Sequence, residues 1–360
     1  MLLGDLLTRN VRKFPHKEAV VFEDTRYTFS QLNGRVNSLA NGLMGIGVKK
    51  GDRVAVLANN CLQYMEIYLA VAKAGMVIVP LNYRLVSKEL SYLLNNSEAN
   101  TLIIGSEYLE TINSIRSGLK GVEHFICLED VPGDTRSYEE LIAGSSPDEP
   151  RVDIDEEDMV AIIYTSGTTG LPKGAVATHR SWFENATNAV IRLQVSSDDI
   201  TLHVTPFFHV APVWPMFAHF YMGATNVILR AFDPQVVLET MEKENITTCN
   251  MVPVMIMRLL ECPNVDKYDL RRLRWIGYGA SPMPLEVLKK AFRVFGKRFI
   301  QVYGLTEAGP LVTILSQEEH ILSGSQKLVK RLESCGRPII NVEAKVVNEG
   351  GDDVAPGEMG

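Results

Sequence analysis

The sequence predicts an α/β protein built from two similar αβαβα subdomains with mostly parallel sheets. The main observation is an alternation of short apolar runs, typical of buried strands, with longer amphipathic runs, typical of helices. This alternation occurs twice, and a stretch rich in acidic residues and proline separates the two occurrences. A chain of 360 residues is also long enough for two packed subdivisions.

The first half is predicted to cover residues 1–150. Its apolar runs are continuous, which is typical of strands that helices cover on both faces of a sheet. The predicted strands are 52–57, 76–80 and 100–104, and the predicted helices are 62–74 and 87–95.

Residues 129–158 are predicted to connect the halves. They hold twelve acidic and two basic residues, a net charge of −10, whereas the whole chain carries −7. We interpret them as a solvated connection. No basic stripe occurs elsewhere, so we expect no nucleic-acid partner.

The second half is predicted over residues 159–310, and a β-rich segment over 334–360 that begins a small β-barrel-like element. The predicted strands are 159–164, 201–204, 225–229, 273–277 and 298–303, and the predicted helices are 182–193, 236–244 and 285–295.

The composition indicates a folded protein of a reducing compartment. Apolar residues make up 46% of the chain and charged residues 22%. The five cysteines are widely spaced and form no CxxC pair, which disfavours a disulfide framework or a zinc site. An acid at Asp5 interrupts the N-terminal apolar residues, and no apolar run reaches the roughly 18 residues of a membrane span. We therefore expect a cytoplasmic protein without a transmembrane segment; the sequence predicts no oligomeric state.

A loop built to surround phosphate oxygens follows the strand that ends at Tyr164. Its glycines let the backbone approach a ligand, its hydroxyls and amides can donate hydrogen bonds, and Lys173 adds a positive charge. It is not a GxxxxGK[ST] loop, because Pro172 and Ala175 occupy positions where that pattern needs glycine, which disfavours a kinase or GTPase. The candidate nucleotide-binding residues of this loop are Thr165, Ser166, Gly167, Thr168, Thr169, Gly170 and Lys173.

Two further turns follow predicted strands, where α/β sheets usually bind ligands. The first contains Tyr303, Gly304, Thr306 and Glu307, which offer a flat ring, a hydroxyl and a carboxylate suited to Mg²⁺. The second contains Gly279, Ala280, Ser281 and Pro282. Pro282 breaks a GxGxxG fingerprint and Met283 breaks a GxSxG elbow, so a dehydrogenase or a serine hydrolase is weakly supported.

Together these motifs resemble those of the adenylate-forming enzymes, which include acyl-CoA synthetases, luciferases and peptide-synthetase adenylation domains. The resemblance implies ATP and Mg²⁺ as ligands, with Tyr303 stacked on adenine, Thr306 at the α-phosphate and Glu307 holding Mg²⁺. It also places Lys173 among the catalytic residues and the Gly279–Pro282 turn beside adenine and the acyl group. Ser281 stands where the family more often has alanine.

An aromatic-rich segment from Phe207 to Phe220 carries His209. A lone histidine of this kind often belongs to a packed core. The resemblance places His209 where acyl-CoA synthetases keep a histidine beside the substrate carboxylate, whereas relatives that activate amino acids have an aspartate. The resulting acyl-pocket candidates are His209, Val210, Trp214 and Gly279, and the aromatic surroundings favour a fatty or other apolar acid.

The resemblance implies ATP-dependent activation of a carboxylic acid to an acyl-adenylate, followed by thioester formation with CoA. It also implies, beyond Gly360, a ribose-binding aspartate, a hinge and a small C-terminal domain with a further lysine. We therefore interpret the 360 residues as a truncated N-terminal domain that is poorly active alone. Three alternatives remain: a luciferase-like or carrier-protein acceptor, a non-catalytic nucleotide-binding module, and, least supported, a dehydrogenase.

Overall fold

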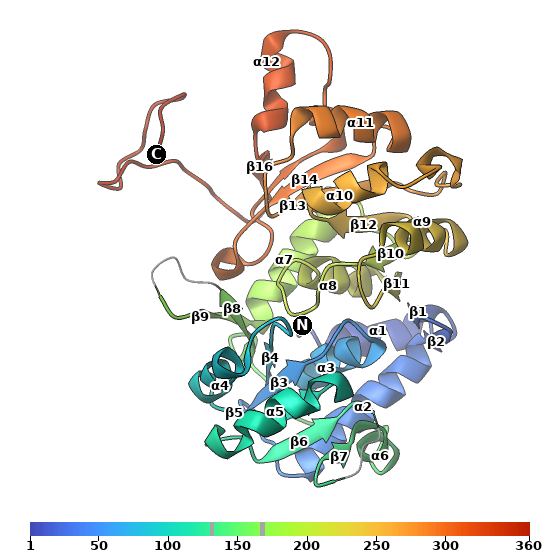
Figure 1. The fold of residues 1–360 in the computed structure, drawn as a ribbon, viewed down its shortest axis with the longest axis vertical. Coiled ribbons are helices and arrows are strands. Elements are labelled where there is room, and N and C mark those ends of the chain that lie inside the picture. The colour runs from blue at the N-terminus through green and yellow to red at the C-terminus, as the bar shows by residue number, and fades with distance from the viewer. Residues whose placement is uncertain (130–132, 166–169) are drawn as a thin grey trace.

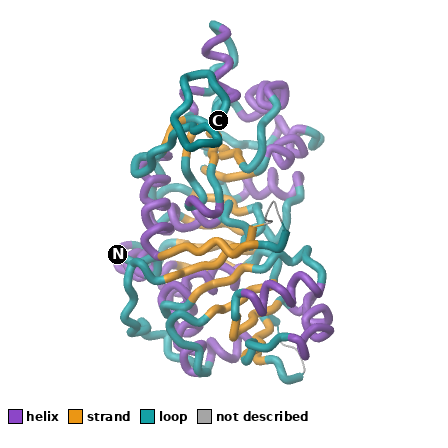
Figure 2. Tube along the Cα trace, turned by 90° about the vertical axis from the view of Figure 1, so that its left-hand side faces the viewer, coloured by secondary structure: helices purple, strands orange, loops and turns teal. Residues whose placement is uncertain are grey.

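The computed structural model describes residues 1–129, 133–165 and 170–360. Two sheets follow one another along the long axis of the molecule, with helices packed against both (Figure 1). Turned by 90°, the molecule shows the strands of the two sheets stacked, with helices on either side (Figure 2). The expected α/β fold with mostly parallel sheets is confirmed.

The seven-stranded sheet forms the lower body in Figure 1. Its neighbouring strands are parallel except for β8 and β9, which pair antiparallel. Its strands lie in the order β7 (Arg136–Ser137), β6 (His124–Cys127), β5 (Ala99–Ile104), β3 (Arg53–Leu57), β4 (Val77–Pro80), β8 (Met159–Thr165) and β9 (Lys173–Thr178). Its helices are α2 (Phe29–Gly45), α3 (Leu62–Lys73), α4 (Ser87–Asn96), α5 (Leu109–Ile115) and α6 (Tyr138–Ala143).

The nine-stranded sheet forms the upper body. It is parallel from β14 to β1 and antiparallel at both edges. Its strands lie in the order β16 (Arg337–Pro338), β15 (Thr313–Leu315), β14 (Phe299–Tyr303), β13 (Trp275–Gly279), β12 (Thr248–Met251), β10 (Ile200–His203), β11 (Thr225–Ile228), β1 (Glu18–Phe22) and β2 (Thr25–Thr28). The remaining helices are α1 (Asp5–Lys13), α7 (His179–Leu193), α8 (Val213–Met222), α9 (Pro234–Lys243), α10 (Pro253–Leu260), α11 (Leu285–Phe295) and α12 (Gln326–Val329).

The sheets do not follow the division expected near residue 150. The N-terminal strands β1 and β2 belong to the upper sheet, where Val20 pairs with Asn226. Conversely, β8 and β9 follow the acidic connection but belong to the lower sheet, where Ala161 pairs with Ile78. Apolar periodicity locates a strand but does not identify its partner, so this exchange could not be predicted from periodicity.

The acidic connection is more than a solvated linker. Glu149 forms an ion pair of 2.6 Å with the ammonium of Lys73, whose side chain is only 4% exposed. That ammonium also donates hydrogen bonds to Thr8, Asn33 and Asn37. Burial lowers the pKa of Lys73, and Glu149 offsets part of this effect. One residue of the acidic run therefore fastens α1, α2 and α3 together.

The C-terminal segment contains less regular β structure than expected. Among the described residues after 334, the strand β16 and one isolated bridge between Val347 and Asp353 are the β elements. Residues 342–347, a short run with several apolar residues, form no named strand. The end of the chain extends away from the sheets, as Figure 1 shows, so no facing layer stabilises strands there.

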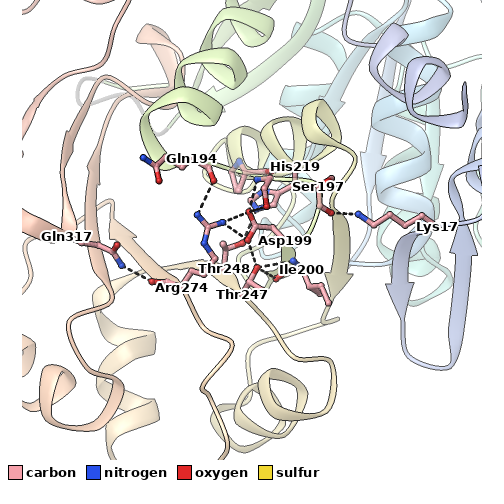
Figure 3. A network of polar contacts seen from close by, with 12 residues as sticks. Lys17, Gln194, Ser197, Asp199, Ile200, His219, Thr247, Thr248, Arg274 and Gln317 are labelled. Atoms are coloured by element: carbon pink, nitrogen blue, oxygen red, sulfur yellow. Dashed lines mark hydrogen bonds and ion pairs between the residues drawn. The ribbon is translucent and has the colours of Figure 1, made fainter. Parts of the chain in front are cut away.

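A polar network fastens the amino-terminal ends of three neighbouring strands of the upper sheet (Figure 3). Asp199, just before β10, is 1% exposed and receives hydrogen bonds from Arg274 at 2.5 and 2.7 Å and from Thr247 at 2.7 Å. Burial raises the pKa of Asp199, but the hydrogen bonds from Arg274, Ser196 and Thr247 outweigh it and lower the pKa below its usual value. The carboxylate therefore stays charged.

Replacing Arg274 by alanine should destabilise the protein by about 3 kcal/mol, because it leaves a buried carboxylate without its counter-charge. Urea unfolding would measure this loss. Arg271→Ala is the matched control, since its partner Asp269 is a surface group. Equal stabilities for the two variants would contradict the role given to Arg274.

Three buried histidines are held uncharged in the folded protein. The ring of His203 forms a hydrogen bond with Asn226, and the ring of His219 forms hydrogen bonds with Pro215 and Thr248. Neither ring nitrogen of His179 has a hydrogen-bond partner among the described residues. Removal from water is the largest cause that lowers each pKa, from 6.5 to about 4.

As the pH is lowered, the protein should therefore begin to lose stability near pH 6.5, above the pH range in which carboxylates usually titrate. As the pH falls from 6.5 to about 4, these histidines bind protons in the unfolded chain but stay unprotonated in the folded protein. The free energy of unfolding should fall by about 1.4 kcal/mol per pH unit for each such histidine. Urea unfolding between about pH 7.5 and 5.5 would measure the slope. His203→Gln should make the slope shallower, because it removes one of the three buried rings.

Candidate nucleotide site

The predicted phosphate loop joins two antiparallel strands. Thr165 ends β8 and pairs with Lys173, which begins β9, so the loop is the tip of a hairpin. The candidates Ser166, Gly167, Thr168 and Thr169 lie outside the described residues. Gly170 has a φ of 148°, a conformation that glycine adopts without steric cost.

The hairpin contacts the second predicted motif. The hydroxyl of Thr165 donates a hydrogen bond of 3.0 Å to Oε1 of Glu307, which lies in a short 3₁₀ turn, Thr306–Ala308, after β14. The two residues are 142 positions apart in the chain: Thr165 belongs to the lower sheet, and Glu307 follows a strand of the upper sheet. Two motifs that the sequence suggested separately thus form one site.

Lys173 is exposed, and its ammonium has no hydrogen bond or ion pair within the described ranges. Its charge is therefore free to pair with an anion at the tip of the hairpin. A lysine ammonium is a common partner of phosphate oxygens because it acts as a compact point charge.

The carboxylate of Glu307 suits Mg²⁺. It is exposed, and Thr165 occupies one of its oxygens, Oε1. No group of three or more acidic, histidine or cysteine side chains among the described residues could hold a metal by itself. Mg²⁺ usually takes one or two carboxylates together with water and substrate phosphates.

A cavity of about 780 Å³ opens beside this motif. Tyr303, whose side chain is 45% exposed, lines it together with Gly304 and the predicted turn from Gly279 to Pro282. Ala280 in that turn has a φ of 65°, which is strained for a residue with a side chain. An aromatic ring beside a polar turn at the carboxyl ends of parallel strands can hold a planar base.

Close backbone contacts explain two of the predicted glycines. A Cβ on Gly279 would lie 2.2 Å from the carbonyl oxygen of Val302, and one on Gly304 would lie 2.1 Å from that of Pro310. Glycine at these two positions lets β13 lie close to β14 and lets the segment after Tyr303 fold back on itself.

The opposite wall of the cavity was not predicted. It comes from the segment 326–335, which includes α12 and the 3₁₀ turn after it. Val329 and Leu332 have the three-residue spacing of one helix face. However, α12 has only four residues, which are too few for a helical pattern to predict it reliably. The lining residues of this segment are Gln326, Val329, Lys330, Leu332, Glu333 and Cys335.

His209 and Val210 lie in a turn between β10 and α8 and are not among the described residues that line this cavity. The ring of His209 is partly exposed and packs 4.2 Å from the ring of Phe208. Removal from water lowers the pKa of His209, and the charge of Arg84 lowers it further. Trp214 is 3% exposed and stacks on Trp275 in the core. The acyl-pocket assignments of His209, Val210, Trp214 and Gly279 therefore stay predictions.

The fold and the site together define an α/β protein with a hairpin and a base-sized cavity at the carboxyl ends of its strands. A family model described as AMP-binding enzyme matches residues 7–360. The chain belongs to this family. The resemblance to acyl-CoA synthetases and the expected fold class are thereby confirmed. None of the helices within the described ranges has the length and hydropathy to span a bilayer.

Curated relatives include a feruloyl-CoA synthase of Amycolatopsis sp, 34% identical over 99% of this chain and 68% of its own length. A long-chain-fatty-acid–CoA ligase of Thermus thermophilus is 33% identical over 98% of this chain and 66% of its own length. The chain thus spans about two thirds of these relatives.

Solved structures show the same fold. The inhibitor-bound N-terminal domain of FACL13 from Mycobacterium tuberculosis has a TM-score of 0.89 and 29% identity, covering 98% of this chain and 86% of that one. The anthranilate CoA ligase AuaEII in complex with anthranoyl-AMP has a TM-score of 0.92 and 25% identity, covering 99% and 68%.

Gly304→Ala should displace the segment that carries Glu307, because the new methyl group would overlap the backbone of Pro310. We expect a loss of about 1–3 kcal/mol in the free energy of unfolding. Urea unfolding measures it, and Gly118→Ala, where nothing lies within 4 Å, is the control. Equal stability of the two variants would show that the contact is not needed.

Proposed function

We propose that this chain binds ATP and a carboxylic acid for the formation of an acyl-adenylate, whose acyl group then passes to CoA. The hydrogen bond between Thr165 and Glu307 is the observation that carries the proposal, because it joins the phosphate hairpin to the predicted magnesium-binding motif. The cavity lined by Tyr303 supports the proposal, because it would accept the adenine near the predicted magnesium-binding motif. The ligases among the relatives support the same chemistry.

The chemical difficulty is the approach of two anions. The substrate carboxylate attacks the α-phosphate of ATP, the bond to pyrophosphate breaks, and the carboxyl oxygen becomes part of a good leaving group, AMP. Lys173 and the donors of the hairpin would offset the negative charge of the triphosphate, and Thr306 would contact the α-phosphate. Glu307 would hold Mg²⁺, which neutralises phosphate charge when bound.

An apolar acid is the substrate class that the surroundings of His209 favour. Phe208 packs against the ring of His209, and the neighbouring Phe207 is fully buried. No acidic residue occurs between Phe207 and Phe220 to pair with the ammonium of an amino acid. The named substrates of the two relatives, a ferulate and long-chain fatty acids, are also carboxylic acids without an ammonium group.

A carrier protein is the second candidate acceptor. A fatty acid–[acyl-carrier-protein] ligase of Streptomyces coeruleorubidus is 32% identical over 96% of this chain. Both acceptors present a thiol to the same acyl-adenylate, so the first half-reaction is shared. Product analysis with CoA or a carrier protein as the sole acceptor distinguishes them.

Lys173→Ala should weaken binding of Mg·ATP by at least about tenfold without lowering the melting temperature, because the exposed ammonium contacts no described residue. Calorimetric titration with Mg·ATP and thermal unfolding measure the two effects. Lys120→Ala, also at an exposed lysine, is the control. A large fall in melting temperature for Lys173→Ala alone would make the lysine structural.

Carboxylate-dependent exchange of labelled pyrophosphate into ATP tests the whole proposal. A panel of fatty and aromatic acids should support exchange better than acetate does. An absence of Mg·ATP binding at high protein concentration would refute the proposal, whatever the acid.

A further inference from the structure

The turn that carries His209 is fixed by the side chains of Asn60 and Tyr68, which belong to the lower body. Residues 206–209 form this turn, in which the backbone N–H of His209 donates to the carbonyl of Pro206 at 3.0 Å. Phe207 and Phe208 are its two central residues, so the orientation of Phe207 determines where the next residues point. We call residues 206–209 the His209 turn.

Asn60, which follows β3, reaches the His209 turn with both ends of its amide. Its oxygen accepts a hydrogen bond of 2.8 Å from the backbone N–H of Phe207. Its nitrogen donates to the carbonyl of Thr205 at 3.0 Å and to that of Leu229 at 3.2 Å. The side chain is 3% exposed, so water cannot replace these partners.

Tyr68 on α3 holds the other backbone group of the same residue. Its hydroxyl donates a hydrogen bond of 2.8 Å to the carbonyl of Phe207, and the side chain is fully buried. Burial raises the pKa of this phenol, so it remains a donor at all physiological pH values. Both backbone groups of Phe207 are therefore bound by side chains of the lower body.

Ring packing adds to these hydrogen bonds. Phe207 lies 5.7 Å from the ring of Tyr64, and Phe208 meets Tyr83 edge-on at 5.1 Å. The ring of His209 in turn packs against Phe208. The His209 turn cannot rotate without leaving buried backbone groups unpaired and separating these rings.

We propose that Asn60 and Tyr68 are positioning residues for His209, and that the lower body thereby orients the group that faces the substrate carboxylate. The second part rests on the proposed function, whereas the positioning itself rests on the contacts alone. Neither residue is itself a catalytic residue, because each acts through the backbone of Phe207.

Tyr68→Phe tests the positioning with the loss of one hydroxyl. Tyr138→Phe is the matched control, since Tyr138 is also fully buried and donates one hydrogen bond of 2.8 Å, but to Glu66. The readout is the NMR signal of the His209 ring, assigned by comparison with His209→Gln. We expect that signal to move in Tyr68→Phe and to stay in place in Tyr138→Phe. An unmoved His209 signal in Tyr68→Phe, or an equal shift in both variants, would overturn the proposal.

Asn60→Ser removes the amide contacts and should move the same signal further. Should this variant not fold, Tyr68→Phe still decides the question. In the exchange assay, Tyr68→Phe should raise the KM for the carboxylate about tenfold and leave the KM for ATP unchanged. A shifted His209 signal with an unchanged carboxylate KM would refute the carboxylate role of His209 and thus that part of the proposed function. An unshifted signal refutes the positioning alone.

Discussion

The pairing of β8 with β9 is the constraint on which the candidate site depends. This hairpin completes the lower sheet beside β4, yet its end reaches Glu307, which follows a strand of the upper sheet. Its strands are thus fixed by the lower body, while Thr165 at the end of β8 contacts a residue of the upper body. The geometry of the nucleotide site follows from how the two sheets are placed, and neither sheet could form it alone.

The His209 turn also depends on both bodies, but here side chains of the lower body support a segment of the upper body. It belongs to the upper body by chain position, but Asn60 and Tyr68 of the lower body bind its backbone. Close backbone contacts then set the remaining parts of the site, since Gly279 and Gly304 allow β13, β14 and the following segment to approach without a side chain between them. The backbone of that turn is strained at Ala280, which has a positive φ.

Much of this fold could be predicted because strands and helices differ in apolar spacing. The helix Leu285–Phe295 has the predicted bounds, and the helix that begins at Leu62 differs by one residue. The loop motifs could also be recognised, because glycines, hydroxyls and one lysine in a short segment have few other uses. What periodicity could not supply was long-range pairing: that β1 lies beside β11, that Glu149 reaches Lys73, or that the segment 326–335 faces Tyr303. Each depends on a contact between distant parts of the chain, for which a single sequence carries no local signal.

The exchange of edge strands also has a consequence for biosynthesis. Val20 leaves the ribosome about 10–40 s before its strand neighbour Asn226 at ordinary rates of translation. During that interval the apolar strand β1 lacks its parallel neighbour β11 and has only β2 beside it, and the lower sheet lacks β8 and β9 until residue 178 has been made. All strands of the lower sheet, β3 to β9, are therefore made before β10, whereas β1 and β2 of the upper sheet must wait for β11. The upper sheet is thus completed late, and its apolar strand β1 is the segment that a chaperone would protect during the wait.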